Sequence, residues 1–302
     1  MKKILKWVGI VFAVLIGLLI LALAVIYNQT ASRLNRVYAA PSDALPIPTD
    51  DASIAYGKRV FQYRGCEACH GENLEGKVYL SDPALGEVNA SNLTTGLGGV
   101  GSEYTDSDWM RAIRYGVRPD GTPLLFMPST EFYFLSDDDL ASVIAYIESV
   151  PPADHEQPRS SLSLTGRVVM TLVPAITFIP AELIPMADPR PVAPEAGVTA
   201  EYGEYLTLSC KVCHGLTMSG GPIPGFPADW PPAPNLTWGA GSRLPAWEEA
   251  DFINFIRTGM KHGRQVDAKY MPWSSYQHMT DDELRAVWVY LQSLPPRDYG
   301  NR

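Results

Sequence analysis

The sequence predicts an all-α protein with two domains of one kind behind an N-terminal transmembrane helix. Three observations lead to this prediction: a long apolar stretch near the N-terminus, a set of motifs that occurs twice, and apolar residues spaced three and four positions apart in each copy. The chain has 302 residues, of which 46% are hydrophobic and 19% charged, which excludes disordered, collagenous and coiled-coil proteins. No segment alternates like a β-strand, so we expect no strands.

Residues 7–26 form the apolar stretch and contain no charge. At about 1.5 Å per residue, this length crosses a bilayer core of about 30 Å, so we expect residues 1–27 to be a membrane anchor. Lys2, Lys3 and Lys6 precede it, which under the positive-inside rule places the N-terminus in the cytoplasm. The alternative is a cleaved secretory signal, with small residues near the end of the stretch as the cleavage site. Under both interpretations the rest of the chain is exported.

The chain is acidic, with 33 Asp and Glu against 24 Lys and Arg and a net charge of −9. Such a surface repels nucleic acid, so we expect no nucleic-acid partner. It favours a partner protein with a basic docking face, whose binding weakens as salt increases.

One five-residue pattern occurs twice, as CEACH at residues 66–70 and as CKVCH at residues 210–214. Four further segment pairs repeat at nearly the same spacing. They are SNLT at 91–94 and PNLT at 234–237, AIRYG at 112–116 and FIRTG at 255–259, MP at 127–128 and 271–272, and SDDDL at 136–140 and TDDEL at 280–284. Two copies of one structural unit explain this register.

The repeat predicts a first domain at residues 52–152 and a second domain at residues 200–302, with a tether at residues 28–51 before them. Residues 153–199 are rich in proline, and we expect an extended connector that lays its apolar side chains on one or both domains. A segment that dips into the membrane or binds a partner is the alternative. The prolines argue against a second spanning helix.

Each domain is expected to have an opening helix before the cysteines, a shorter helix and a last helix. The shorter helices cover about residues 106–115 and 248–258, and a glycine ends each of them. The last helices begin at Ser136 and Thr280, which form capping boxes with the acid three residues on, and end at a double proline.

The Cys-x-x-Cys-His pattern is typical of covalent haem attachment. Two thiols three positions apart on a helical turn reach the two vinyl groups of a haem, and the next histidine ligates the iron. The predicted residues are Cys66, Cys69, Cys210 and Cys213 for the thioethers of two haem c groups and His70 and His214 for the irons. A zinc site would place its cysteine pairs about 15–20 residues apart, a thioredoxin-like pair needs a strand and a helix beside it, and a disulfide leaves the histidines unexplained.

Met127 and Met271 are the predicted sixth ligands of the two irons. The first follows His70, and the second follows His214, at the same separation, and a proline comes next in both copies. Core packing is the alternative role of a buried methionine. Thioether ligation raises the reduction potential, and iron with six ligands has no open position for a substrate.

Several other sulfur and nitrogen donors have no counterpart in the other half of the chain. They are Met110, Met218, Met260, Met279, His155, His262 and His278. A ligand role for the unpaired histidines would give a bis-histidine iron; a surface or hydrogen-bonding role is the alternative that we favour.

Three residue pairs have candidate roles around the haems. Carbonyl groups in the loops at Pro83 and Pro234 are candidate acceptors for the second nitrogen of each ligating histidine. The other two pairs are Arg114 with Arg257 and Asn92 with Asn235. The arginines either pair with haem propionates or are solvated at the helix ends. The asparagines either contact the haem edge or cap a loop.

These motifs resemble two class I cytochrome c domains in tandem, over about residues 53–152 and 200–297. More narrowly, the NLT segment, the MP loop and the capped last helix resemble the haem-bearing cytochrome c subunits of membrane-bound bacterial dehydrogenases and related anchored dihaem carriers. The resemblance implies that the first and last helices of each domain cross where a glycine meets an aromatic residue. The matching pairs are Gly57 with Tyr146 and Gly203 with Tyr290.

The sequence thus predicts a membrane-anchored dihaem c-type cytochrome with no catalytic residues of its own. It would carry single electrons in a respiratory chain on the periplasmic or extracytoplasmic side of the cytoplasmic membrane, between a respiratory or dehydrogenase donor and a downstream acceptor. Its partners would be membrane lipid, through the N-terminal helix, and redox proteins. The alternative is a dihaem enzyme, of the peroxidase or thiosulfate dehydrogenase type, in which one haem is catalytic.

Overall fold

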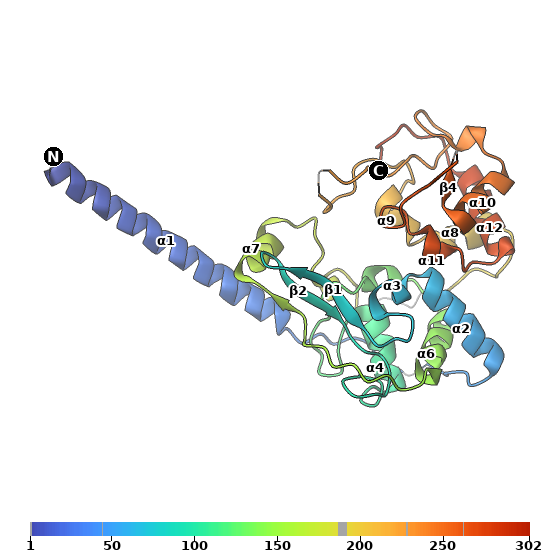
Figure 1. Ribbon diagram of the computed structural model, residues 1–302, viewed down its shortest axis with the longest axis horizontal. Coiled ribbons are helices and arrows are strands. Elements are labelled where there is room, and N and C mark those ends of the chain that lie inside the picture. The colour runs from blue at the N-terminus through green and yellow to red at the C-terminus, as the bar shows by residue number, and fades with distance from the viewer. Residues whose placement is uncertain (1, 44, 187–191, 228, 262) are drawn as a thin grey trace.

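The computed structural model describes residues 2–43, 45–186, 192–227, 229–261 and 263–302. Helices make up most of its regular structure, so the predicted mainly helical fold is confirmed. One long helix projects from two groups of shorter helices (Figure 1).

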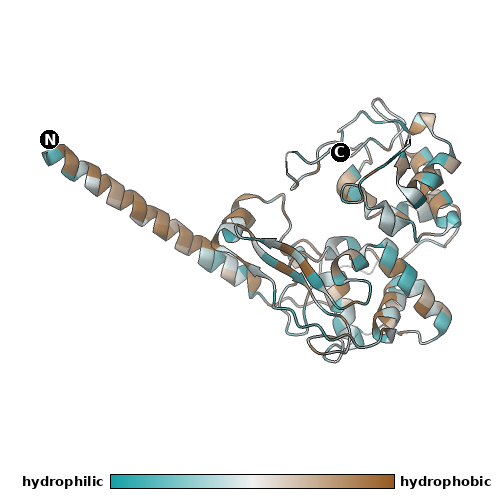
Figure 2. Ribbon diagram, viewed as in Figure 1, coloured by the Kyte–Doolittle hydropathy of each residue, from teal (hydrophilic) through white to brown (hydrophobic). Residues whose placement is uncertain are grey.

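The long helix, α1 (Lys2–Leu34), is long and apolar enough to cross a membrane. Its large apolar side chains are exposed over most of its length, and the hydropathy colours of Figure 2 mark most of the helix as hydrophobic. The helix continues past the predicted anchor, so the expected tether begins in a helix and not in a loose segment. The residues that follow lie against the first domain, where Tyr38 donates its backbone N–H to the carbonyl of Gly121 at 2.9 Å and Leu45 is buried.

The first domain contains the three predicted helices and two short ones. They are α2 (Asp51–Tyr63), α3 (Cys66–His70), α4 (Asp106–Met110), η1 (Arg111–Tyr115), α5 (Ser129–Phe132) and α6 (Asp137–Ser149). Together α4 and η1 occupy the predicted helix at 106–115, but its second half is a π-helix. It ends as predicted at Gly116, whose φ of 66° suits a residue without a side chain.

The expectation that the chain has no strands is wrong. A hairpin of β1 (Lys77–Asp82) and β2 (Gly86–Ala90) follows the cysteine motif, and β3 (Ser161–Leu162) pairs with β2. The strands are short and partly exposed, so they leave no apolar alternation in the sequence. The matching segment of the second domain, residues 221–234, contains six prolines, which cannot donate to a strand ladder. Its described residues, 221–227 and 229–234, form one isolated bridge and no strand.

The second domain repeats the helical frame. Its elements are α8 (Ala200–Leu206), α9 (Cys210–His214), η3 (Leu244–Ala246), α10 (Glu249–Thr258), α11 (Trp273–Tyr276), α12 (Asp281–Ser293) and a small hairpin of β4 (Met260–Lys261) and β5 (Arg264–Gln265). The predicted helix at 248–258 is therefore α10, with Glu248 as its N-cap.

The predicted caps start both last helices, but only the second is a complete capping box. The Thr280 hydroxyl accepts a hydrogen bond from the backbone N–H of Glu283, and the Glu283 carboxylate accepts one from the backbone N–H of Thr280. At Ser136 the hydroxyl caps the N–H of Asp139, whose carboxylate instead accepts hydrogen bonds from the hydroxyls of Tyr56, at 2.6 Å, and Tyr205. Because Tyr205 belongs to α8, this buried carboxylate joins the two domains.

The expected crossing of the first and last helices is present in both domains. A Cβ atom on Gly57 would lie 1.8 Å from the carbonyl oxygen of Ser142 in α6, one turn before Tyr146. In the second domain a Cβ on Gly203 would lie 2.0 Å from the Ala286 carbonyl oxygen and 2.7 Å from Cβ of Tyr290. The helices therefore pack closer than any side chain at these positions allows.

The connector packs mainly on the first domain. It contains α7 (Leu164–Leu172) and the short turn η2 (Pro180–Glu182), and Phe178 and Ile179 are buried in the core. The backbone N–H of Phe126 donates to the Phe178 carbonyl at 3.1 Å. The connector thus lays Met170, Phe178 and Ile179 on the protein, whereas Leu164 and Leu172 of α7 are exposed. The expected extended form is wrong for Leu164–Leu172, which is a helix. Residues 187–191 lie outside the described residues.

We predict that Gly57→Ala lowers the free energy of unfolding by about 3 kcal/mol or more, at the upper end of the usual cost of overpacking, because the new methyl group meets a backbone carbonyl. Urea unfolding followed by circular dichroism measures it. Gly197→Ala is the matched control, since its nearest atom lies 3.9 Å away. Equal midpoints for the two variants would contradict the close crossing.

Candidate functional site

The four residues predicted to hold the first haem line one cavity. Cys66, Cys69, His70 and Met127 surround a space of about 540 Å³, within the range of about 300–1,000 Å³ for cofactor pockets. The rest of the wall is mostly apolar. It includes Phe61, Trp109, Ile113, Leu124, Val143 and Ile147. Two thiols, an imidazole and a thioether in an apolar pocket fit a covalently attached haem.

The histidines of the two motifs are oriented by backbone carbonyls. His70 Nδ1 lies 2.9 Å from the Ser91 carbonyl oxygen, and His214 Nδ1 lies 2.9 Å from that of Pro234. A carbonyl only accepts, so Nδ1 carries the proton and Nε2 is free to ligate a metal. The expected acceptor at Pro234 is confirmed, whereas the one at Pro83 is wrong, because Ser91 takes that role.

Burial keeps both imidazoles in the neutral form that a metal ligand requires. It lowers the pKa of His70, although the hydrogen bond to Ser91 opposes this, and it lowers the pKa of His214 to about 4. Both rings are therefore uncharged at neutral pH.

The two predicted methionine ligands occupy equivalent turns. In each, the methionine carbonyl accepts a 2.7 Å hydrogen bond from the backbone N–H two residues on, Ser129 after Met127 and Trp273 after Met271. The proline between them begins α5 or α11. Before Met127, Phe126 has a φ of 58°, an uncommon conformation for a side chain of this size.

The second site has the same donor types in a much smaller space. Cys210, His214 and Met271 line a cavity of about 40 Å³, room for about three water molecules. Cys213 lies half-buried on the same turn of α9. The donors fit haem attachment, but Tyr276 and the other side chains that close this cavity would have to move outward to admit a macrocycle.

Two unpaired methionines also line the second cavity, and the repeat explains them. Met218 has the register position of Leu74: both are fully buried with a φ of 60°. Met279 likewise has the position of buried Leu135. Because leucine occupies both positions in the first domain, these methionines are core residues, and Met271 alone matches Met127.

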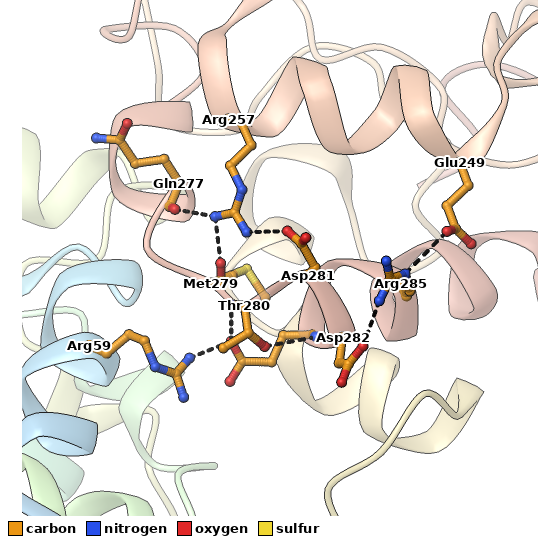
Figure 3. A network of polar contacts seen from close by, with 10 residues as sticks. Arg59, Glu249, Arg257, Gln277, Met279, Thr280, Asp281, Asp282 and Arg285 are labelled. Carbon is orange, nitrogen blue, oxygen red and sulfur yellow. Dashed lines mark hydrogen bonds and ion pairs between the residues drawn. The ribbon is translucent and has the colours of Figure 1, made fainter. Parts of the chain in front are cut away.

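The arginines and asparagines in register bind the protein itself. Arg114 is fully buried and donates to Asp137 and to the Leu135 carbonyl, each at 2.7 Å, so a solvated role for it is wrong. Figure 3 shows that the equivalent Arg257 donates hydrogen bonds to Asp281 and to the carbonyls of Gln277 and Met279. These contacts tie the shorter helix to the last helix.

Asn92 and Asn235 cap loops, which is one of the two expected roles. Asn92 accepts from the backbone and hydroxyl of Thr94 and donates to the Ala153 carbonyl at 2.7 Å. Asn235 repeats this with Thr237 and the Arg297 carbonyl. His155 has the expected hydrogen-bonding role, with Nδ1 2.9 Å from the Glu75 carbonyl, whereas His262 lies outside the described residues.

Arg64 lies between the two cysteine helices, a placement that the sequence did not reveal. Its side chain lines the first cavity, and its guanidinium lies 5.3 Å from the rings of both Tyr63 and Tyr205. Within the described chain its Nε has no hydrogen-bond partner. Burial raises the pKa of the Cys66 and Cys210 thiols to about 12, and the Arg64 charge opposes this at both.

Glu131 is the acidic residue of the same region. It lines the first cavity, and burial raises the pKa of its carboxyl to about 7, although Arg64 opposes the shift. Val212, between the cysteines of the second motif, lines the first cavity too. The two motifs therefore meet at the contact between the domains.

An ion pair also joins the domains. Arg59 of α2 contacts Glu283 at the start of α12 (Figure 3), and the Glu283 side chain is 6% exposed. With the Asp139 carboxylate, this contact holds α2 and α6 against the second domain.

The fold and the donor set define a c-type cytochrome. The cytochrome c family model matches residues 54–151 and 200–295, and the chain belongs to this family. Proteins of this family bind haem c covalently.

The relatives include cytochrome subunits of dehydrogenases. The chain is 31% identical to the cytochrome c subunit of alcohol dehydrogenase (quinone) from Gluconobacter oxydans, over 82% of this chain and 55% of the relative. It is 27% identical to the fructose dehydrogenase cytochrome subunit of Gluconobacter japonicus, over 86% of this chain and 56% of the relative. It is 24% identical to a diheme cytochrome c-type of Cereibacter sphaeroides, over 91% of this chain and 96% of the relative. The chain thus spans about half the length of these dehydrogenase subunits.

We predict that the reduction potential of the first haem falls as the pH rises through about 7. Glu131 then loses its proton, and a negative charge beside the cavity favours ferric over ferrous iron. Glu131→Gln stays neutral and should remove this step. Spectroelectrochemical titration of the haem-loaded protein, from about pH 5 to about pH 9, measures the effect.

The control for this experiment is Glu72→Gln, which removes an exposed carboxylate two residues after His70. Its potential should keep the pH dependence of the parent protein. An unchanged slope in Glu131→Gln would assign the pH dependence to another group.

Proposed function

We propose that this chain is a membrane-anchored dihaem electron carrier on the outer side of the cytoplasmic membrane. The observation that carries the proposal is the cavity of the first domain, where two cysteines, a histidine and a methionine chosen from the sequence lie around one apolar space. The repeat of the same donor types in the second domain supports a second haem. A bound haem would supply a one-electron couple.

The residues of the chain then have distinct roles. Cys66 and Cys69 would fix the macrocycle, and the Ser91 carbonyl holds the His70 ring in the tautomer that ligates iron. Met127 would complete the coordination and raise the potential. The apolar wall would keep water from a bound iron, which also favours the reduced form. With both axial positions filled, the protein would transfer electrons without binding a substrate.

The names of the relatives support a dehydrogenase as the electron donor. The cytochrome subunits of alcohol and fructose dehydrogenases match most of this chain. We propose that the chain accepts electrons from a dehydrogenase, or from the catalytic subunit of one, and passes them to a downstream acceptor. The approach of Val212 to the first cavity supports transfer between the two haems inside the chain.

We predict that Met127→Ala converts only the first haem to a high-spin or water-ligated form with a lower potential, and that Met271→Ala does the same to the second. The methionine-to-iron charge-transfer band and the potential of each haem are the measurements. Met218→Leu is the control, because it removes a buried sulfur from the second cavity but restores the residue found at Leu74. An unchanged spectrum in Met127→Ala would show that Met127 is a core residue and not a ligand of the iron.

An uncleaved anchor and a cleaved signal would give mature proteins that differ in mass and in location. We predict that the mature protein keeps α1, so its intact mass includes residues 1–27, and that it remains in the membrane after washing with high salt and carbonate. A mass that lacks the apolar stretch, with the protein in the soluble fraction, would establish the cleaved signal.

The acidic surface predicts a salt-dependent partner. Electron transfer to a basic acceptor cytochrome should slow as ionic strength rises from about 0.01 M to about 0.15 M, because the screening length falls from about 30 Å to about 8 Å. Stopped-flow reduction of the acceptor measures this. A rate that does not change with salt would rule out docking through a basic face.

A further inference from the structure

Helix α7 lies beside the C-terminal end of α1. The Arg167 guanidinium lies 4.5 Å from the Tyr27 ring and donates to the Thr30 hydroxyl at 3.0 Å. Arg33 forms a 2.6 Å ion pair with Glu182, the last residue of η2. Figure 1 shows α7 at the edge of the globular part from which the rest of α1 projects. The contacts fix the connector to residues 27–33 of α1.

These α1 residues are the ones that follow the uncharged stretch. The stretch ends at Ile26, and Tyr27 is the aromatic type found at membrane–water boundaries. Arg33 comes six residues later, about 9 Å along the helix. The α1 residues that contact α7 therefore span the headgroup layer of the bilayer that α1 would cross.

The surface of α7 and the residues after it is apolar and exposed. Residues 168–181 contain no charged residue, although the chain has a net charge of −9. Leu164, Leu172 and Leu183 are 47%, 67% and 64% exposed, while Met170 faces the interior at 4%. A short helix with an outward apolar face beside a spanning helix is typical of a segment that lies in the membrane interface.

We propose that α7 and the residues that follow it, Leu164–Ile176, form a second membrane contact in the outer leaflet. The occupant of this face is lipid, because the face continues the apolar surface of α1 at the level where α1 leaves the bilayer. The proposal rests on the proposed spanning role of α1. A protein partner on the same face is the competing outcome.

The membrane contact would bring the first haem site close to the lipid surface. Ala175 and Ile176 at the end of the contact, and Thr177 directly after it, line the first cavity. The loop at Pro224–Phe226 of the second domain lines it as well, and a Cβ on Gly225 would lie 2.7 Å from the Ala175 carbonyl oxygen. The membrane-facing segment is thus part of the wall of the first site, and the second domain covers its other side.

Spin labels on the full-length, haem-loaded protein in phosphatidylcholine vesicles test the proposal. Leu172→Cys, Leu97→Cys and Leu15→Cys would each carry one nitroxide, and their collision rates with oxygen and with a water-soluble nickel complex report depth. Leu97 is the matched control, since it is 64% exposed in a loop of the first domain. We expect the oxygen-to-nickel ratio to be several-fold higher at position 172 than at position 97.

The label in α1 separates failure of this proposal from failure of the anchor. Leu15 lies in the middle of the uncharged stretch and should give the highest ratio. A lipid-exposed label at 15 with a water-exposed label at 172 would overturn the membrane contact and leave the α7 face to a protein partner. A water-exposed label at 15 would overturn the anchor, and the α7 proposal with it. Absorption spectra of the three variants confirm that both haem sites are intact.

Discussion

The close crossing of two helices at one glycine per domain is the constraint on which both candidate haem sites depend. A side chain at Gly57 or Gly203 would meet a backbone carbonyl at about 2 Å, so the first and last helices approach to this distance only with glycine there. The cysteine helices α3 and α9 follow the crossing helices after a few residues. Arg114 and Arg257 then tie the shorter helix to the start of the last one. The crossing therefore sets the position of the cysteines and of the wall opposite them.

Much of this arrangement was predictable because the chain contains its own comparison. The second copy of the motif identified Met127 and Met271 as matching residues, and it explains Met218 and Met279 as replacements of Leu74 and Leu135. The wrong prediction at Pro83 came from a search for a proline, whereas the repeat itself aligned Ser91 with Pro234. The β1–β2 hairpin was not predictable, because its strands are half-exposed and the second domain has prolines in the same place.

The contact between the domains could not be predicted from periodicity, since neither copy alone specifies what faces it. The residues at this contact are nevertheless those that depart from the repeat. Arg64 has Leu208 at its register position, and Glu131 has Ser275. Asp139 and Glu283 match as acids, but one binds two tyrosines and the other an arginine of the opposite domain. Positions at which the two copies differ in sequence thus mark the surface through which the two domains contact each other.

The same asymmetry bears on how a haem would enter the first site. Its wall includes Ala175–Thr177 of the connector, and Val212 and Pro224–Phe226 of the second domain, all of which follow Cys66 and Cys69 in the chain. In an exported chain, the segments that come earlier in the sequence reach the outer side of the membrane first. The cysteines are therefore accessible before these later segments have crossed. Thioether formation on an open first domain requires no later opening, whereas insertion after the domains dock would require breaking the buried contacts of Asp139 and Glu283. The order that costs least free energy would be haem attachment first and domain docking second, so the contact between the domains would close over a site that is already filled.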